Sequence, residues 1–151
     1  MSTAADWPRE AVLAALAAFP ARLATAATAA ASAAASRPVP AGEWGAEEVV
    51  RHLIACETDV HQGRLEDLDR DPAPSWDWAE PGPWAGEPGL SLDALLDRFA
   101  ALRSDTLCTV TGLDEAGWAR SGTHSTLGVF DVRALLANAV DHDEEHLAGL
   151  R

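Results

Sequence analysis

The sequence contains no lysine and little positive charge of any kind. Its 11 basic residues are all arginine, and against 24 acidic residues they leave a formal net charge of −13. Affinity for nucleic acid comes mostly from cationic side chains that displace counterions from phosphates. The composition therefore argues against nucleic acid as a partner.

Cysteine is also scarce. Cys56 and Cys108 are the 2 cysteines of the chain, which are too few for a disulfide scaffold, and both fall within helix-like segments. We therefore expect a reduced, cytoplasmic protein.

A secretion signal and a membrane span are both expected to be absent. The alanine-rich stretch from Ala11 to Ala35 follows Asp6 and Glu10, where a signal peptide would be basic. Arg22 and several serine and threonine residues interrupt its apolar character. We therefore expect the mature chain to begin near Met1 and to stay out of the membrane.

Alternating strand patterns are lacking, whereas apolar residues recur at helical spacing in four segments. These segments are residues 6–36, 46–68, 91–110 and 131 to the C-terminus. Asp6, Ser91 and Asp131 are the expected caps, and Pro20 should kink or break the first helix. Because 151 residues are the usual size of one domain, the pattern predicts a single all-α domain, a four-helix bundle spanning residues 1–151.

Two of the connections differ in character from a simple turn. Residues 71–89 form a long segment rich in proline, glycine and tryptophan, and loops of this length are often functional. Residues 120–128 show no regular pattern and are predicted to be irregular.

Histidine is the residue type that suggests chemistry. His142 and His146 lie four positions apart on a predicted helix, so both imidazoles project from one face. His52 lies on the apolar face of the second predicted helix. Histidines that face inward from two helices of a bundle are typical of metal sites. The sequence therefore predicts that His52, His142 and His146 bind one divalent ion.

Simpler interpretations exist for each piece. A histidine pair among acidic residues is often a solvated helix face, and a lone histidine on an apolar stripe is often a core residue. His61, nine residues after His52, should point away from the site. His124 can reach the cavity mouth, and Asn138 can line it. Cys56 is either a fourth ligand or a small buried apolar residue.

A metalloprotease is disfavoured. Residues 142–146 fit a His-x-x-Glu-His pattern, but that class needs an acidic ligand well downstream, and only five residues follow His146. Asp143 stands where the commoner His-Glu-x-x-His motif needs its glutamate.

Three segments resemble the DinB/YfiT-like family, which includes thiol-dependent transferases and the metal-binding domain of mycothiol-dependent maleylpyruvate isomerases. They are residues 44–53 (WGAEEVVRHL), 124–132 (HSTLGVFDV) and 142–147 (HDEEHL). The resemblance implies an up-down-down-up four-helix bundle, commonly dimeric, that binds a divalent ion through His52, His142 and His146. Gly45 stands where the family often has a serine or threonine cap. The loop of residues 71–89 is unlike that of a generic member, so the resemblance does not supply a substrate.

Three neutral ligands leave an ion its full charge, which lowers the pKa of a bound water or thiol. Together with the resemblance, this makes a thiol-dependent S-transferase with a low-molecular-weight thiol our first hypothesis. A metal-dependent hydrolase and a non-catalytic metal- or ligand-binding stress protein are the alternatives. Zinc and nickel are the first candidates for the ion, followed by iron, cobalt and copper. We expect a small-molecule substrate and a homodimer, and the sequence identifies no catalytic residue besides the ligands.

Overall fold

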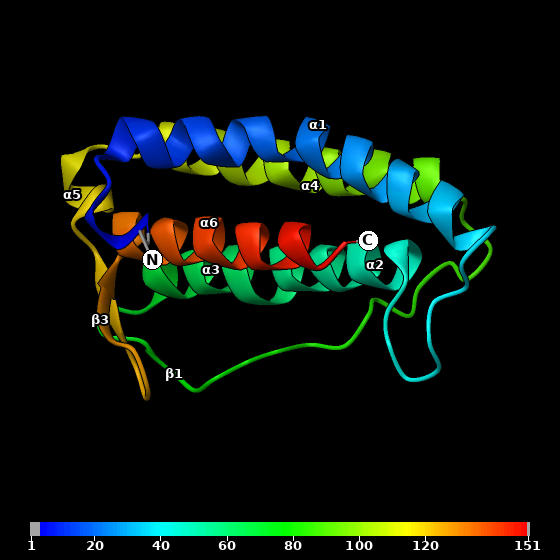
Figure 1. Ribbon diagram of the computed structural model, residues 1–151. Coiled ribbons are helices and arrows are strands. Elements are labelled where there is room, and N and C mark those ends of the chain that lie inside the picture. The colour runs from blue at the N-terminus through cyan, green and yellow to red at the C-terminus, as the bar shows by residue number, and fades with distance from the viewer. Residues whose placement is uncertain (1–3, 151) are drawn as a thin grey trace.

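The helices lie in two layers along one common direction (Figure 1). The computed structural model describes residues 4–150; Met1–Thr3 and Arg151, which the expected domain includes, lie outside them. The elements, in chain order, are η1 (Ala4–Asp6), α1 (Arg9–Ala34), α2 (Ala46–Ala55), η2 (Cys56–Gln62), α3 (Gly63–Arg70), β1 (Ser75–Trp76), α4 (Leu92–Thr111), α5 (Glu115–Trp118), β2 (Ser121–His124), β3 (Gly128–Asp131) and α6 (Val132–Gly149). Helices α1 and α4 form one layer, and α6 and the continuous α2-η2-α3 rod form the other. In Figure 1, α1 and α6 run from left to right, whereas the rod and α4 run from right to left.

Two of the three expected helix caps are present. The side chains of Ser91 and Asp131 each accept a hydrogen bond from the backbone amide three residues later, at 3.2 and 2.7 Å. Asp6 does not cap α1, because it belongs to η1 and Pro8 occupies the capping position. Proline is suited to a helix start because it has no amide hydrogen to leave unpaired.

Helix α1 continues through Pro20 without a break. The break that we considered from the sequence does not occur, although the helix changes direction near its middle in Figure 1. A proline inside a helix removes one backbone hydrogen bond and crowds the preceding turn, which bends the rod without ending it when packing holds both halves.

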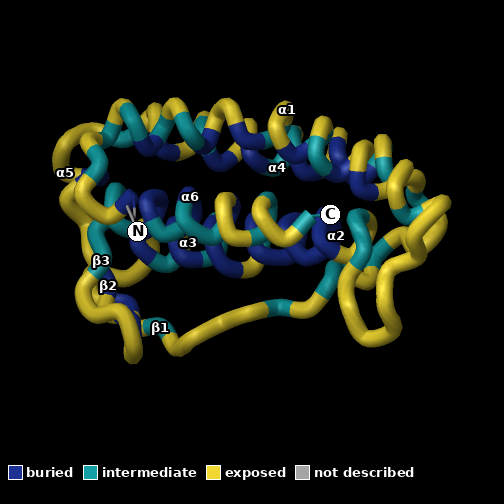
Figure 2. The backbone as a smooth tube through the Cα atoms, in the orientation of Figure 1, coloured by how far each residue is buried: buried dark blue, intermediate teal, exposed yellow. Residues whose placement is uncertain are grey.

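The core lies between the two layers, where the buried faces of the helices meet (Figure 2). Towards the α2 end, the side chains of Phe19, Leu53, Leu95 and Phe99 pack together, and the Phe19 and Phe99 rings meet edge to face with centroids 5.8 Å apart. A second apolar cluster fills the other end. Burial of these side chains, at about 25 cal/mol per Å² of apolar surface, holds the layers together.

The second predicted helix is continuous, but residues Cys56–Gln62 are π-helical. A π-turn holds about one residue more than an α-turn, so each residue advances roughly 20° less around the axis. Side chains beyond Cys56 therefore face a direction that α-helical periodicity does not predict.

A small three-stranded sheet lies at one end of the bundle, so the prediction of an all-α four-helix bundle is confirmed only in part: the fold is mostly helical. Strand β1 pairs in parallel with β2, and β2 pairs with β3 as an antiparallel hairpin. Residues 120–128, predicted to be irregular, contain β2 and the hairpin turn. Strands of two to four residues are too short for an alternating pattern to be recognised.

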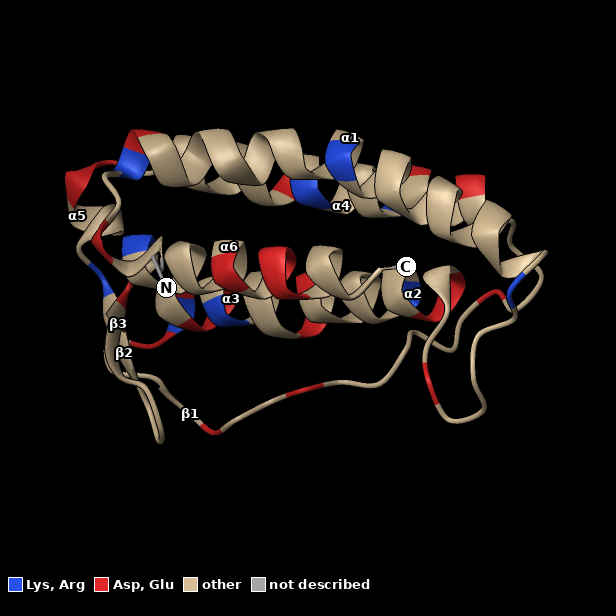
Figure 3. Ribbon diagram, in the orientation of Figure 1, with Lys and Arg blue, Asp and Glu red and all other residues tan. Residues whose placement is uncertain are grey.

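Helix α1 is, within residues 4–150, the one helix long and apolar enough to cross a membrane by length and composition. Arg22 and the hydroxyl residues therefore do not exclude such a span by composition alone, and the expectation that the chain stays out of the membrane stays a prediction. A core helix of a soluble protein and an N-terminal signal sequence pass the same test. In this structure the apolar stripe of α1 packs inside the bundle, and the helix carries few charges (Figure 3).

Gly122 provides a test of the sheet. A Cβ atom at this position would lie 2.6 Å from Trp76 Cζ3 and 2.9 Å from the carbonyl oxygen of Pro74, inside van der Waals contact. We predict that Gly122→Ala lowers the free energy of unfolding by about 1–3 kcal/mol. For a chain of this size, that corresponds to a fall in Tm of about 2–10 °C, measured by circular dichroism.

Gly89→Ala is the matched control, because a Cβ there meets nothing within 4 Å. An equal loss of stability in both variants would contradict the packing argument.

Candidate metal centre

Three imidazoles from two elements converge between α2 and α6. His52 projects from α2 and is fully buried, whereas His142 and His146 project from successive turns of α6. The Nε2 atom of His52 lies 3.4 Å from that of His142 and 3.0 Å from that of His146. The Nε2 atoms of His142 and His146 are 3.1 Å apart. The structure thus brings together the three histidines that the sequence selected.

Glu80, which sequence reasoning missed, completes the group. Its Oε1 atom lies 3.0 Å from His52 Nε2, 3.4 Å from His142 Nε2 and 3.8 Å from His146 Nε2. The four ligand atoms lie within 4.8 Å of one another. The available signal was indirect, since Glu80 belongs to the long loop of residues 71–89.

The spacing of these atoms fits a divalent ion. Ligands about 2.0–2.1 Å from a tetrahedral zinc ion are separated from one another by roughly 3.3 Å. The Nε2 separations of 3.0–3.4 Å match that value. Three imidazoles and a carboxylate are also a donor set that zinc, nickel and related ions accept.

The protonation of the histidines suits ligation as well. His52 Nδ1 lies 2.6 Å from the carbonyl oxygen of Pro81, which can only accept, so Nδ1 donates and the lone pair of Nε2 faces the centre. Burial lowers the pKa of His142, and burial with the nearby His142 and His52 lowers that of His146 to about 4. Neutral imidazole is the form that binds metal.

Arg51 anchors the loop that carries Glu80. Its guanidinium donates to the carbonyl oxygens of Trp84, Gly86 and Glu87 at 2.7–3.0 Å. Arg51 itself is buried despite its charge. Because these bonds hold the segment after Pro81 against α2, the placement of Glu80 is built into the fold.

A small cavity of about 40 Å³ adjoins the centre. It has room for about one water molecule. His142 Nδ1 is buried and has no hydrogen-bond partner within residues 4–150. The residues that line this cavity include Cys56, His61, Arg64, Glu80, His124, Asn138 and His142. The expectations that His124 and Asn138 line the site therefore agree with their positions.

His61 was predicted to point away from the site, and that prediction is wrong. The side chain is buried, lines the cavity and places its ring centroid 6.2 Å from that of His142. The π-helical segment is the reason, because it removes roughly 100° of rotation between His52 and His61. The Nδ1 atom of His61 lies 3.1 Å from a carboxylate oxygen of Glu57, to which it donates.

Cys56 lies close to the centre but outside the group of four ligand atoms. Its sulfur is 3.5 Å from His52 Nε2 and 3.9 Å from His142 Nε2. Burial, reinforced by the nearby carboxylate of Glu80, raises the pKa of the thiol well above its ordinary value. Of the two roles left open for Cys56, the small buried apolar residue fits these surroundings better.

A buried ionic network next to the centre joins α4, η2 and α6. Arg103 of α4 donates two hydrogen bonds to Glu57 of η2 and two to Asp143 of α6, all at 2.9–3.1 Å. The hydroxyl of Thr106 donates to Glu57 as well. Burial raises the pKa of Asp143. Burial also acts to raise the pKa of Glu57, but the hydrogen bonds and charges of His61 and Arg103 outweigh this effect, so the pKa of Glu57 is lowered. The sequence gave no sign of this long-range network.

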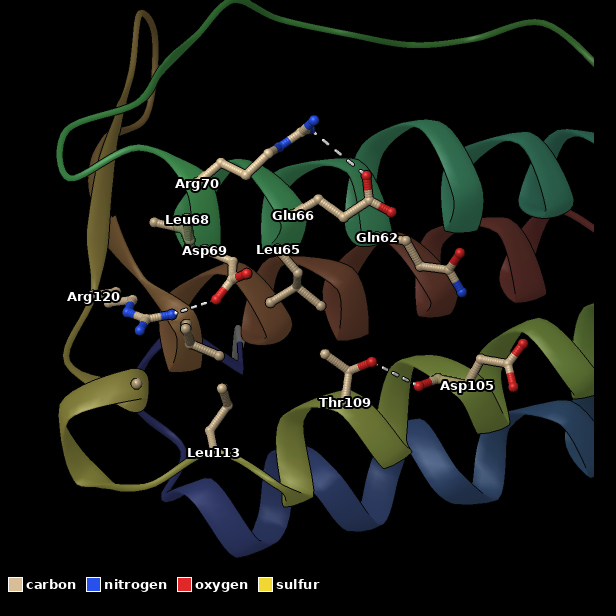
Figure 4. A pocket seen from close by; sticks show the side chains of 12 residues that line it. Gln62, Leu65, Glu66, Leu68, Asp69, Arg70, Asp105, Thr109, Leu113 and Arg120 are labelled. Atoms are coloured by element: carbon tan, nitrogen blue, oxygen red, sulfur yellow. Dashed lines mark hydrogen bonds and ion pairs between the residues drawn. The ribbon is translucent and has the colours of Figure 1, made fainter.

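A larger cavity lies elsewhere, between α3, α4 and α5 (Figure 4). It measures about 440 Å³ and has an apolar floor that includes Leu65 and Leu113. Two ion pairs are among its lining residues, Arg120 with Asp69 and Arg70 with Glu66. Neither histidine nor cysteine is among its lining residues. The smaller cavity beside the histidines is therefore the better candidate for chemistry.

Single substitutions test the ligand assignment. We predict that His52→Ala and His142→Ala each weaken metal binding by more than roughly a hundredfold, because a direct ligand is lost. His61→Ala should keep its metal, since His61 donates to Glu57 and lies outside the ligand group. Elemental analysis of protein purified without a metal-affinity tag measures this, and equal metal content in all three variants would overturn the assignment.

The comparisons with known proteins agree with this architecture. The structure is similar to YfiT from Bacillus subtilis, described as a probable metal-dependent hydrolase with an unusual four-helix bundle topology. The TM-score is 0.71 at 18% sequence identity, over 94% of this chain and 83% of that one. No curated protein matches the sequence. The family model of the DinB superfamily matches residues 5–149, and the chain therefore belongs to the DinB superfamily.

Proposed function

We propose that this protein is a metal-dependent hydrolase of a small-molecule substrate, with an up-down-down-up four-helix bundle as its scaffold. One observation carries the proposal. The carboxylate of Glu80 lies 3.0–3.8 Å from all three Nε2 atoms, at the position where a reacting group would enter. A carboxylate beside an electrophilic ion is the arrangement that hydrolases use to take a proton from water.

Each residue of the centre has a separate role in the proposed reaction. A divalent ion, when bound, lowers the pKa of a water ligand and polarises a carbonyl oxygen. His52, His142 and His146 would hold that ion, with His52 oriented by Pro81. Glu80, whose side chain is 43% exposed, can swing away from the ligands and accept a proton at its carboxylate. The description of YfiT as a probable metal-dependent hydrolase supports this choice.

Thiol-dependent transfer is the second candidate. In its favour, the three histidines are neutral ligands, so an incoming thiolate would feel the full charge of the ion. Against it, Glu80 already brings a negative charge to the same position, which repels an anionic sulfur. The geometry therefore favours water over a thiol.

Glu80→Gln separates the two candidates. The amide cannot accept a proton, so we predict that hydrolysis falls by roughly a hundredfold or more, while the three histidines still hold the ion and metal content falls far less than in His52→Ala. In the cobalt-substituted protein, azide should perturb the visible spectrum, and small thiols should produce no sulfur-to-metal charge-transfer band. A thiol band that disappears in His146→Ala would instead favour the transferase, and unchanged turnover in Glu80→Gln would overturn the role of Glu80.

The wider setting of the chain is also a proposal. We place it as a single domain in the cytoplasm, without nucleic acid or membrane as a partner. The predominantly acidic composition supports the first exclusion. The packing of the α1 stripe inside the bundle supports the second.

We further predict a homodimer formed through helix faces. Outward positions of α1 are mostly alanine, which allows a second helix to approach closely. Light scattering at micromolar concentration should give a mass near twice 15.9 kDa. A monomer under these conditions would contradict the prediction.

A further inference from the structure

Arg64 is a buried cation that forms no ion pair within the described part of the chain. Of the arginines before Arg151, three are buried, at 7% exposure for Arg51, 8% for Arg64 and 1% for Arg103. Arg51 pairs with Glu47 and Arg103 with Glu57, but no carboxylate of residues 4–150 lies within 4.0 Å of the Arg64 nitrogens. In a chain with 24 acidic residues, the absence of a carboxylate from this position is unusual.

The few contacts of Arg64 leave most of its donors free to bind a ligand. Its Nη2 atom donates to the carbonyl oxygen of Asp77 at 3.3 Å, and its guanidinium carbon lies 5.6 Å from the centroid of the Trp76 ring. Burial lowers the pKa of Arg64, and the charge of Asp67 on the same helix offsets this only in part. Five N–H groups are available on a guanidinium, so this side chain keeps unused hydrogen-bonding capacity.

His124 adds a fixed donor beside Arg64. Its Nδ1 atom accepts hydrogen bonds from the backbone amides of Thr126 and Leu127, at 3.0 and 3.1 Å. A nitrogen that accepts two bonds carries no proton, so the hydrogen of the neutral ring lies on Nε2. Burial, together with the charge of Arg64, lowers the pKa of His124 and keeps the ring neutral. The hairpin between β2 and β3 therefore sets the direction of this donor.

Both residues line the cavity that adjoins the metal centre. The same walls include Glu80 and His142, which belong to the ligand group. The π-helical segment turns Arg64 towards this cavity, as it does His61. A group bound by Arg64 and His124 would therefore lie a short distance from the position of the ion. Its entry requires the 43%-exposed side chain of Glu80 to swing outwards, because the cavity otherwise has room for about one water molecule.

We propose that Arg64 and His124 form a carboxylate-binding subsite beside the metal centre, and that the substrate is a small molecule carrying a carboxylate near its reacting bond. The fork of a guanidinium matches the two oxygens of a carboxylate, and the Nε2 donor of His124 supplies a further hydrogen bond. The substrate carboxylate provides the counter-charge that Arg64 lacks. This inference rests on the proposed function, because it names the substrate class of that site.

The nearby acidic residues set the limits of the subsite. Glu80 lies on the metal side of the cavity, Asp77 raises the pKa of His124 by its charge, and Asp67 raises the pKa of Arg64 by its charge. All three would repel a carboxylate, but none forms an ion pair with Arg64. Whether the site prefers a negative, neutral or positive group at this position therefore tests the proposed subsite.

Three hydroxamates of similar length provide the probes, because the hydroxamate group binds the metal in each. Butyrohydroxamate has a neutral tail, succinic monohydroxamate a carboxylate tail and β-alanine hydroxamate an ammonium tail. Each is titrated into the cobalt-substituted protein and followed by its visible spectrum. We expect the carboxylate probe to bind roughly tenfold to a hundredfold more tightly than the neutral one, and the ammonium probe no more tightly than the neutral one.

Variants assign the preference to Arg64. Arg64→Met should abolish the advantage of the carboxylate tail and leave neutral-probe binding unchanged. Arg64→Lys, which keeps the charge without the fork, should retain part of the advantage and serves if the methionine variant does not fold. Arg120→Met removes an equal charge from an exposed pair outside this cavity and should behave like the unaltered protein.

The outcomes separate the two proposals. If no hydroxamate perturbs the spectrum, the metal centre is wrong and the subsite falls with it. If all three bind with equal affinity, or the ammonium probe binds best, the metal centre stands and the subsite is overturned. A fall in Tm for Arg64→Met with an intact carboxylate preference would show that Arg64 is merely structural, because replacing an unpaired buried charge by an apolar side chain should cost little stability.

Discussion

The metal-centre histidines depend on one buried guanidinium, that of Arg103. From α4 it reaches both neighbouring elements, binding Glu57 of η2 and Asp143 of α6. Asp143 directly follows His142 in the chain, so the rotation of α6 that satisfies Arg103 also determines where His142 points. Taking one cation and two carboxylates out of water costs several kcal/mol per ion, which only complete pairing can offset. The network is therefore stable when all three charges are paired, and removing one partner costs much stability. This ties the position of α6 to that of the helix carrying His52.

Much of this arrangement could be predicted from local sequence patterns. Apolar spacing indicated the four long helical segments, because an amphipathic stripe is a property of consecutive residues. Ser91 and Asp131 were recognisable as caps, since a cap bonds an amide only three residues away. The convergence of His52 with His142 and His146 followed from their places on inward faces. Their role as metal ligands stays a prediction that metal analysis can test.

The remaining features depend on contacts between distant residues or on irregular backbone. Glu80 reaches the histidines because Arg51 fixes its loop, and no local pattern reveals such an anchor. Strand β1 exists only because a distant part of the chain pairs with it: the amides of Thr123 and Ser125 donate to the carbonyl oxygens of Pro74 and Trp76. His61 was misplaced because the helical wheel assumes a constant 100° per residue. Each error has the same origin, since a wheel or a pattern describes one segment without its neighbours.

The π-helical segment also means that the chemistry of this cavity is encoded by a count of residues as well as by their identities. Between Cys56 and Gln62 the chain contains more residues per turn than an α-helix would need. Regular α-helix over the same number of residues would turn Arg64 away from His124 by roughly 100° or more, whereas deleting one residue together with the π-turn would roughly restore its direction. An insertion or deletion in this segment that is not matched by a change between π- and α-helix would therefore turn the residues after it to another face. A sequence alignment that ignores such an insertion or deletion will match residues that do not face the same cavity.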